Sequence, residues 1–91
     1  MAFMVGSFNV PDFDEWKALF DADRVGRKEV ATGHTVSQAV DDPNHVFVRV
    51  DFPSVEAAQD YRERLLAAGI LDNMGVETMP TVVEMVDSAT Y

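Results

Sequence analysis

Apolar residues recur along this chain with two different periods, and the order of these periods predicts an order of strands and helices. Alternation of apolar and polar residues, with many β-branched and aromatic side chains, is typical of strands. Recurrence every three to four residues is typical of amphipathic helices. Four segments have the strand pattern, namely residues 2–9, 34–40, 46–52 and 81–86. One helical segment follows the first of these strands, and another follows the third.

Each helical segment begins with a residue suited to cap a helix. Asp12 and Glu15 have the spacing of a capping box, in which Asp12 accepts hydrogen bonds from first-turn amides. Ser54 is suited to cap the second helix. Gly33 and Gly69 are expected to end the two helices, because glycine is favoured just past a helix C-terminus. The apolar stripes are Phe13, Trp16, Leu19 and Phe20 in the first helix and Val55, Ala58, Tyr61, Leu65 and Leu66 in the second.

The order strand, helix, strand, strand, helix, strand favours a ferredoxin-like α+β fold. In that plan a four-stranded antiparallel sheet carries both helices on one face and leaves the other face bare. The length of 91 residues fits a single domain spanning positions 1–91. A chain of this size has a marginal core, and its bare face would expose apolar side chains. Two sheets stacked through their bare faces would cover them, so we predict a homodimer that forms an α+β barrel.

The turn signal at residues 41–44, Asp-Asp-Pro-Asn, predicts a tight connection between the second and third strands. A hairpin closed there places three pairs of residues opposite each other: His34 with Asp51, Val36 with Arg49, and Gln38 with Phe47. Opposed side chains share a face of the sheet, so these six are expected on the bare face. The alternation of the last strand places Glu84 there as well. A slip of one residue would exchange the two faces of the second strand.

Composition and charge exclude several classes of function. The 16 acidic and 7 basic side chains give a net charge of −9, which disfavours binding to nucleic acid or to anionic membranes. The chain contains no cysteine, which excludes disulfides and thiolate chemistry. Its two histidines form no recognisable metal motif, and we expect neither a metal nor a cofactor. It shows no signal peptide or membrane-spanning run, so a cytoplasmic protein is expected.

The predicted bare face carries the residues best suited to chemistry. His34 beside Asp51 could form a catalytic dyad in which the carboxylate orients the imidazole and raises its basicity. The alternative is a cross-strand hydrogen-bonded pair. Arg49 could bind a substrate carboxylate or enolate, or it could pair with Asp51, Glu84 or a residue of a partner chain. Gln38 could add a hydrogen bond to either arrangement.

Other candidate residues lie on the helices and at a strand end. Trp16 is expected in the core, or alternatively in the wall of a pocket. Tyr61 is expected to pack along its helix, with a hydroxyl that could reach a cavity. Asn9 ends a strand, where it favours a turn or could donate to an oxyanion. The cations that crowd the later turns of the first helical segment are expected on a solvated face, paired with neighbouring acids: Arg24, Arg27 and Lys28.

A family resemblance that spans nearly the whole chain rests on five stretches, namely residues 10–17, 20–21, 27–33, 41–44 and 52–58. They resemble the dimeric α+β barrel superfamily, which includes antibiotic-biosynthesis monooxygenase-like proteins and small isomerases. The resemblance implies a dimer formed through the sheets and a substrate bound between sheet and helices. Phe8 stands where similar sequences often carry a histidine, and Asn9 is similar to an asparagine of the cofactor-independent monooxygenases. Both are therefore candidate substrate-binding residues.

These observations predict a homodimer that binds a small, partly apolar or anionic molecule, and they leave open whether it is an enzyme. If it is, cofactor-independent monooxygenation, isomerisation or cyclisation is expected, with His34 as the base and Arg49 steadying negative charge. The main alternative is a non-catalytic stress-related or accessory dimer whose sheet face serves only assembly. A third hypothesis, based on charge alone, is an acidic partner for a basic protein.

Overall fold

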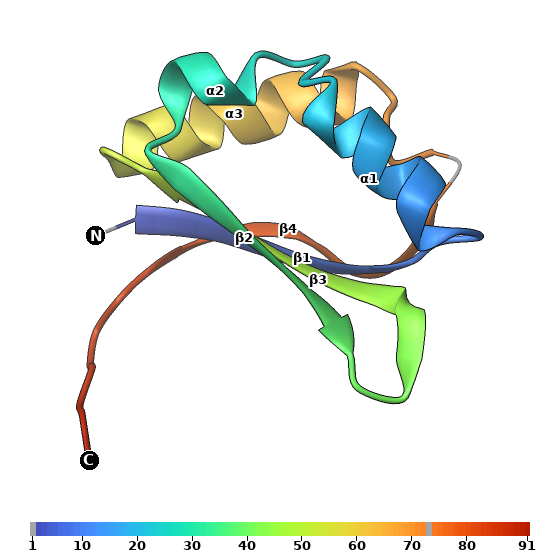
Figure 1. The fold of residues 1–91 in the computed structure, drawn as a ribbon. Coiled ribbons are helices and arrows are strands. Elements are labelled where there is room, and N and C mark those ends of the chain that lie inside the picture. Colours follow the sequence, from blue (N-terminus) through green and yellow to red (C-terminus); the bar gives the residue numbers. More distant parts are fainter. Residues whose placement is uncertain (1, 73) are drawn as a thin grey trace.

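The computed structural model describes residues 2–72 and 74–91, and its elements follow the predicted order. The strands are β1 (Ala2–Asn9), β2 (Gly33–Ala39), β3 (Asp42–Phe52) and β4 (Gly75–Glu84). The helices are α1 (Phe13–Asp21), α2 (Arg27–Val30) and α3 (Val55–Ala67). Beyond β4, residues 85–91 leave the sheet as an extended segment (Figure 1).

The strands form one antiparallel sheet in the order β2-β3-β1-β4. The three helices lie on one face of this sheet, and no helix of the described residues covers the other face (Figure 1). The C-terminal segment and the β2–β3 hairpin extend past the sheet on the two sides of this bare face (Figure 1). The arrangement confirms the predicted ferredoxin-like α+β fold, with the short helix α2 in addition to the two predicted helices.

Both predicted helix caps are confirmed. The carboxylate of Asp12 accepts a hydrogen bond from the Glu15 amide at 3.0 Å. The hydroxyl of Ser54 accepts one from the Ala57 amide at 3.1 Å. These bonds satisfy first-turn amides that have no partner within the helix. They fix where α1 and α3 begin and hence which of their residues face the sheet.

The first helical segment ends earlier than predicted. α1 stops at Asp21, and the chain then turns through two residues with positive φ, Asp23 at 57° and Gly26 at 76°. Aspartate and glycine are among the residues that tolerate this left-handed conformation. Gly33 does not end a helix but begins β2. The turn decides the direction in which the residues of α2 point.

The last strand is longer than predicted and irregular. β4 begins at Gly75, well before the predicted start at residue 81. Thr78 pairs with Ser7 and Thr81 with Val5, so two residues of β4 oppose a single residue of β1. One of the two is Pro80, which lacks the amide that a regular ladder needs and is tolerated on an edge strand at such a bulge.

The predicted register of the β2–β3 hairpin was wrong by one residue. Gly33, rather than His34, lies opposite Asp51, and His34 lies opposite Val50. Consequently His34, Val36 and Gln38 belong to the helix-covered face with the valines of β3. Phe47, Arg49 and Asp51 remain on the bare face, as predicted. The placement of Glu84 was also wrong, because it pairs with Ala2 on the helix-covered side.

The error arises at the end of the hairpin. Between Gln38 and Ala39 the pairing jumps from Val46 to Asp42, so residues 43–45 have no partner in β2 and form a bulge in the β2–β3 ladder. The Gln38 side-chain amide donates to the Pro43 carbonyl at 3.1 Å and stabilises the bulge. The chain therefore turns at residues 40–41, before the proline that marked the predicted turn.

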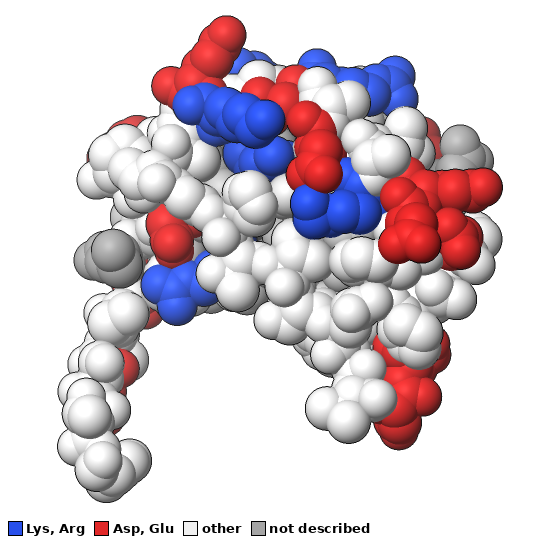
Figure 2. All heavy atoms as spheres, in the orientation of Figure 1, with Lys and Arg blue, Asp and Glu red and all other residues white. Residues whose placement is uncertain are grey.

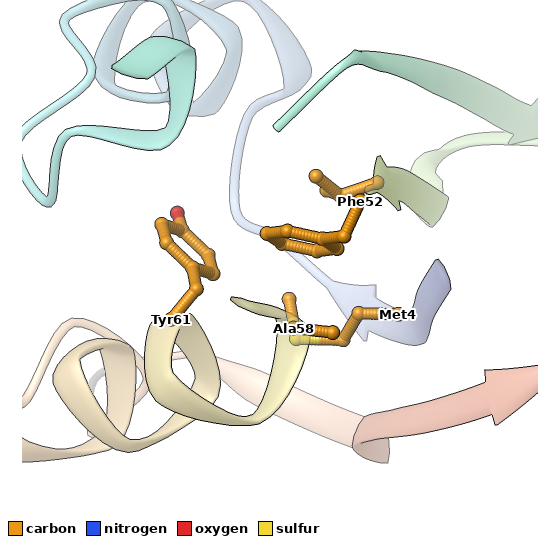
Figure 3. Close-up of a cluster of buried hydrophobic side chains, with 5 residues drawn as sticks. Met4, Phe52, Ala58 and Tyr61 are labelled. Atoms are coloured by element: carbon orange, nitrogen blue, oxygen red, sulfur yellow. The ribbon is translucent and has the colours of Figure 1, made fainter. Parts of the chain in front are cut away.

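Two clusters of buried side chains join the helices to the sheet. One consists of Met4, Val50, Phe52, Ala58 and Tyr61, and joins α3 to β1 and β3 (Figure 3). The other consists of Phe8, Val10, Trp16, Val46 and Leu71, and joins α1 to the same two strands. Because the helices rest on the sheet through separate clusters, the space between the clusters can stay open.

Charged side chains are unevenly distributed. Figure 2 shows basic and acidic groups intermingled over the helix layer, with acidic groups gathered near the start of α1 and at the tip of the β2–β3 hairpin. Of the helices described, none is long and apolar enough to cross a membrane.

Candidate functional site

A cavity of about 510 Å³ lies between the helix-covered face of the sheet and helices α1 and α3. Its volume falls in the range of small-molecule sites, which is roughly 300–1,000 Å³. The apolar part of its wall includes Phe8, Trp16, Phe20, Tyr61 and Leu65. Three residues predicted to bind substrate, Phe8, Trp16 and Tyr61, therefore line one cavity.

The aromatic wall on α1 follows from helical spacing. Trp16 is buried and packs against Phe20, with ring centroids 5.2 Å apart, and against Phe13, with centroids 5.9 Å apart. Stacked and tilted aromatic pairs at such distances are favourable beyond the area they bury. This ladder of rings gives the cavity a flat apolar side.

Among the described residues, the cavity wall also carries three acids and two arginines, of which one, Arg27, is buried. Arg27 is 4% exposed, which makes it the buried cation of a chain whose other charges are largely on the surface. The guanidinium lies 3.7 Å from the centre of the Phe20 ring, and its Nη1 donates to the Phe20 carbonyl at 3.1 Å. Its Nη2 is buried and has no hydrogen-bond partner among the described residues.

The sequence-based interpretation of Arg27 was therefore wrong. We expected it on a solvated face with Arg24 and Lys28, and those two side chains are indeed exposed. The turn at Asp23 and Gly26 directs Arg27 inward instead. The combination of an aspartate and a glycine three residues later was the one available sign of a break before α2.

Tyr61 faces the same region from α3. Figure 3 shows its hydroxyl pointing away from Met4 and Ala58, whose side chains fill the other end of the cluster. Burial raises the pKa of the Tyr61 hydroxyl, while Arg27 acts in the opposite direction through its charge and through a side-chain interaction with the hydroxyl. The group is thus a protonated hydrogen-bond donor near neutral pH.

The predicted dyad of His34 and Asp51 does not exist in this fold. The one-residue slip places the two side chains on opposite faces of the sheet. His34 packs edge-on against Phe20, with ring centroids 5.0 Å apart. Desolvation, followed by the charge of Arg27, lowers the pKa of His34. Asp51 therefore cannot raise the basicity of this imidazole.

Arg49 and Asp51 form an ion pair on the bare face, with Arg49 Nε 2.8 Å from the Asp51 carboxylate. The Arg49 guanidinium also lies 3.9 Å from the centre of the Phe3 ring. These contacts are the ones expected if Arg49 pairs with Asp51 within the fold instead of binding a ligand. Arg49 still borders an open hollow of about 490 Å³ on the bare face, which Phe47 and Ser37 also line.

The remaining predicted site residues lie apart from both hollows. Gln38 is occupied by the hairpin bulge, and Glu84 is exposed at the end of β4. Asn9 is exposed at the end of β1, opposite His45 and Gly75. Their binding roles stay predictions, and the structure does not bring these residues together.

A polar cluster on the bare face was not predicted. Ser7 is buried and donates to the Glu77 carboxylate at 3.2 Å, and His45 Nε2 contacts the same carboxylate oxygen. The hydrogen bond with His45, and then that with Ser7, hold the pKa of Glu77 below its usual value. The early start of β4, which brings Glu77 into the sheet, was not visible in the sequence pattern. In the part of the chain that is described, no group of histidine and carboxylate side chains is arranged to hold a metal ion.

Comparison with known proteins places this geometry in a known fold. A candidate antibiotic biosynthesis monooxygenase from Deinococcus radiodurans superimposes with a TM-score of 0.73 at 13% identity, over 100% of this chain and 98% of that chain. A second one, from Bordetella bronchiseptica, gives 0.66 at 15% identity, over 97% of each chain. A dimeric ferredoxin-like protein from an uncultured marine organism gives 0.59 at 15% identity, over 100% of both chains.

The fold is that of the antibiotic biosynthesis monooxygenase-like proteins. No family model matches the sequence, and no curated protein matches it. At such low identity the shared fold does not carry a shared reaction. The function has to be argued from the cavity and its side chains.

Proposed function

We propose that this protein binds a small, largely apolar molecule with one anionic group in the cavity between the sheet and α1 and α3, and that Arg27 holds the anion. The observation that carries the proposal is that Arg27, a residue of the cavity wall, has a buried Nη2 with no hydrogen-bond partner among the described residues. A carboxylate, phenolate or enolate oxygen would complete its hydrogen bonds.

Energetics support an anionic ligand. A buried donor without a partner costs about 1–3 kcal/mol, and more when it is charged. The Phe20 ring and carbonyl offset part of this cost for Arg27. The carboxylate of Asp23 is 3.9 Å from Nη1, which is too long for a hydrogen bond. An anion inside the cavity would gain a charge-assisted bond in a poorly hydrated site, where such bonds are strongest.

The finer form of the proposal is cofactor-independent chemistry on the bound anion: monooxygenation, isomerisation or cyclisation. A guanidinium beside an aromatic ring system would stabilise negative charge on an enolate or phenolate oxygen. The Tyr61 hydroxyl, protonated at neutral pH, is a second donor near the same place. The names of the structural neighbours, which include antibiotic biosynthesis monooxygenase, are consistent with such chemistry.

We also propose that the protein is a homodimer assembled through the bare face. That face presents Phe3, Val5, Phe47 and Val83 without a covering layer, and Phe47 is 43% exposed. Uncovered apolar surface of this kind favours association. A structural neighbour is described as dimeric. A non-catalytic dimer, stress-related or accessory, is the second candidate function, because this face could serve assembly alone.

Binding of 2-naphthoate and of neutral 2-naphthalenemethanol, measured by calorimetry and thermal shift, tests the proposed cavity. Arg27→Met and Arg49→Met each remove one cation, so they have the same net charge and differ only in which hollow they change. We expect 2-naphthoate to bind wild type and Arg49→Met alike, and Arg27→Met about 10- to 100-fold more weakly. The alcohol should bind more weakly than the acid and be insensitive to Arg27.

Equal affinity of the acid for wild type and Arg27→Met would overturn the proposal, as would a loss confined to Arg49→Met. Because Arg27→Met could fold poorly, Arg27→Lys provides a second measurement. It keeps the charge but loses the planar pair of donors, so the affinity should fall between the other two. Amide chemical-shift changes on addition of 2-naphthoate should cluster on α1, α3 and the helix-covered face.

A further inference from the structure

The position of Asp23 in the cavity wall suggests which ligands the cavity prefers. Asp23 follows α1 with φ of 57°, and its backbone carbonyl accepts a hydrogen bond from the Gly26 amide at 3.0 Å. The Lys28 amide donates to Asp23 Oδ2 at 3.1 Å. One carboxylate oxygen is therefore committed to the turn that starts α2, and the orientation of the carboxylate is fixed.

The other oxygen, Oδ1, has only a long ion pair with Arg27 Nη1, at 3.9 Å. Asp23 Oδ1 is buried, and no described residue forms a hydrogen bond with it. Asp23 is among the residues that line the cavity, as is Arg27, whose Nη2 also lacks a partner. Two residues of the cavity wall, paired with each other at 3.9 Å, thus each keep one buried polar atom without a hydrogen bond. An anion alone would satisfy Arg27 but would be repelled by Asp23.

We propose that Asp23 Oδ1 accepts a hydrogen bond from a hydroxyl group of the ligand, next to the anionic group that Arg27 holds. The preferred ligands are then hydroxylated aromatic acids, or enols of the same shape, rather than acids without a hydroxyl. This inference rests on the proposed function of the cavity and makes Asp23 the residue that determines specificity. A site with a buried acceptor disfavours ligands that leave it unpaired.

The test compares 2-naphthoate with its 3-hydroxy and 4-hydroxy derivatives and with the matching methoxy compounds. A methoxy group has similar bulk but cannot donate. We expect at least one hydroxy isomer to bind wild type about tenfold or more tightly than both the parent acid and its methoxy counterpart. The readout is the ratio between the affinity of a hydroxy compound and that of its methoxy counterpart, because both carry the same carboxylate and the general effect of charge near Arg27 cancels.

Two substitutions at position 23 keep the left-handed backbone, since asparagine and glycine both tolerate it. In Asp23→Asn the amide oxygen has to accept from Lys28 N, so the amide nitrogen points into the cavity as a donor. The hydroxyl preference should disappear or pass to the methoxy compound. Asp23→Gly offers neither group and should bind the members of a pair within about twofold of each other.

The two proposals fail in different ways. If no naphthoate binds, or binding does not depend on Arg27, the function proposed for the cavity falls and this inference falls with it. If naphthoates bind through Arg27 but the hydroxy isomers have no advantage over parent and methoxy compounds, only the inference is overturned. The same holds if the advantage persists in both Asp23→Asn and Asp23→Gly. Circular dichroism and urea unfolding of the variants check that each one folds.

Discussion

The guanidinium of Arg27 contacts Phe20 through two different groups of that residue, the aromatic ring and the backbone carbonyl. The ring centre of Phe20 lies 3.7 Å from the guanidinium carbon, and the Phe20 carbonyl accepts from Nη1 at 3.1 Å. Phe20 is in the last turn of α1, where carbonyl groups lack helical partners and carry the negative end of the helix dipole. The end of α1 thus substitutes for water around a buried cation.

Replacement of Phe20 should reveal this dependence. Phe20→Leu removes the ring face and should lower the free energy of unfolding by about 2 kcal/mol, from lost packing and a lost cation–π contact. Phe13→Leu is the matched control, because Phe13 packs on the same Trp16 without a cation. Urea denaturation should show a larger loss for Phe20→Leu, by about 1 kcal/mol. Equal losses would mean that the ring does not stabilise Arg27.

The pH dependence of stability should report on His34. Desolvation lowers its pKa in the folded state, so the unfolded chain binds its proton more readily. The neutral imidazole therefore stabilises the fold above the unfolded pKa of about 6.5, and this contribution is lost as the pH falls below that value. Between pH 8 and 5.5, wild type should lose more stability than His34→Gln in urea unfolding. Parallel curves for the two proteins would contradict the expected shift.

Addition of a methyl group at Gly6 should destabilise the fold. A Cβ there would lie 3.1 Å from the tip of the Phe8 ring and 3.3 Å from the Thr78 carbonyl. We expect Gly6→Ala to destabilise the fold by about 1–3 kcal/mol and to weaken ligand binding, because Phe8 would be pushed into the cavity. At Gly33 the nearest atom would be 3.9 Å away, so Gly33→Ala should be neutral or stabilising by up to about 1 kcal/mol. Thermal unfolding of both variants measures the difference.

Assembly through the bare face can be tested with two variants, each of which introduces one carboxylate at a different place on the surface. Phe47→Glu places a carboxylate in the proposed interface and should give a monomer in sedimentation at micromolar concentration. Leu19→Glu puts the same group on α1, at a residue that is 60% exposed, and should leave the dimer intact. Dimers in both variants, or a monomeric wild type, would refute this mode of assembly.

The sequence predicted the fold because its signals are local. The caps at Asp12 and Ser54 and the two periods of apolar residues each depend on a few neighbouring positions, and each was confirmed. The prediction of three residues that line the cavity depended on the same local signals. Phe8, Trp16 and Tyr61 follow strand or helix spacing, and the covering of one sheet face by helices brings them together.

The errors arose where one local irregularity of the backbone changes which way the neighbouring side chains point. The bulge after Gln38 moved His34 to the opposite face from Asp51. The left-handed turn at Asp23 buried an arginine that charge alone assigned to the surface. Neither event changes the apolar period, so neither leaves a mark in the pattern. A predicted dyad is more sensitive to register than a predicted core.

The positive φ of Asp23 limits which residues can replace it with little strain, chiefly asparagine and glycine. A single base change converts an aspartate codon into a codon for either one. These three residues offer the cavity an acceptor, a donor or no polar group, and none of them requires the backbone to move. Position 23 is therefore a site at which ligand preference can evolve in one mutational step while the fold is retained.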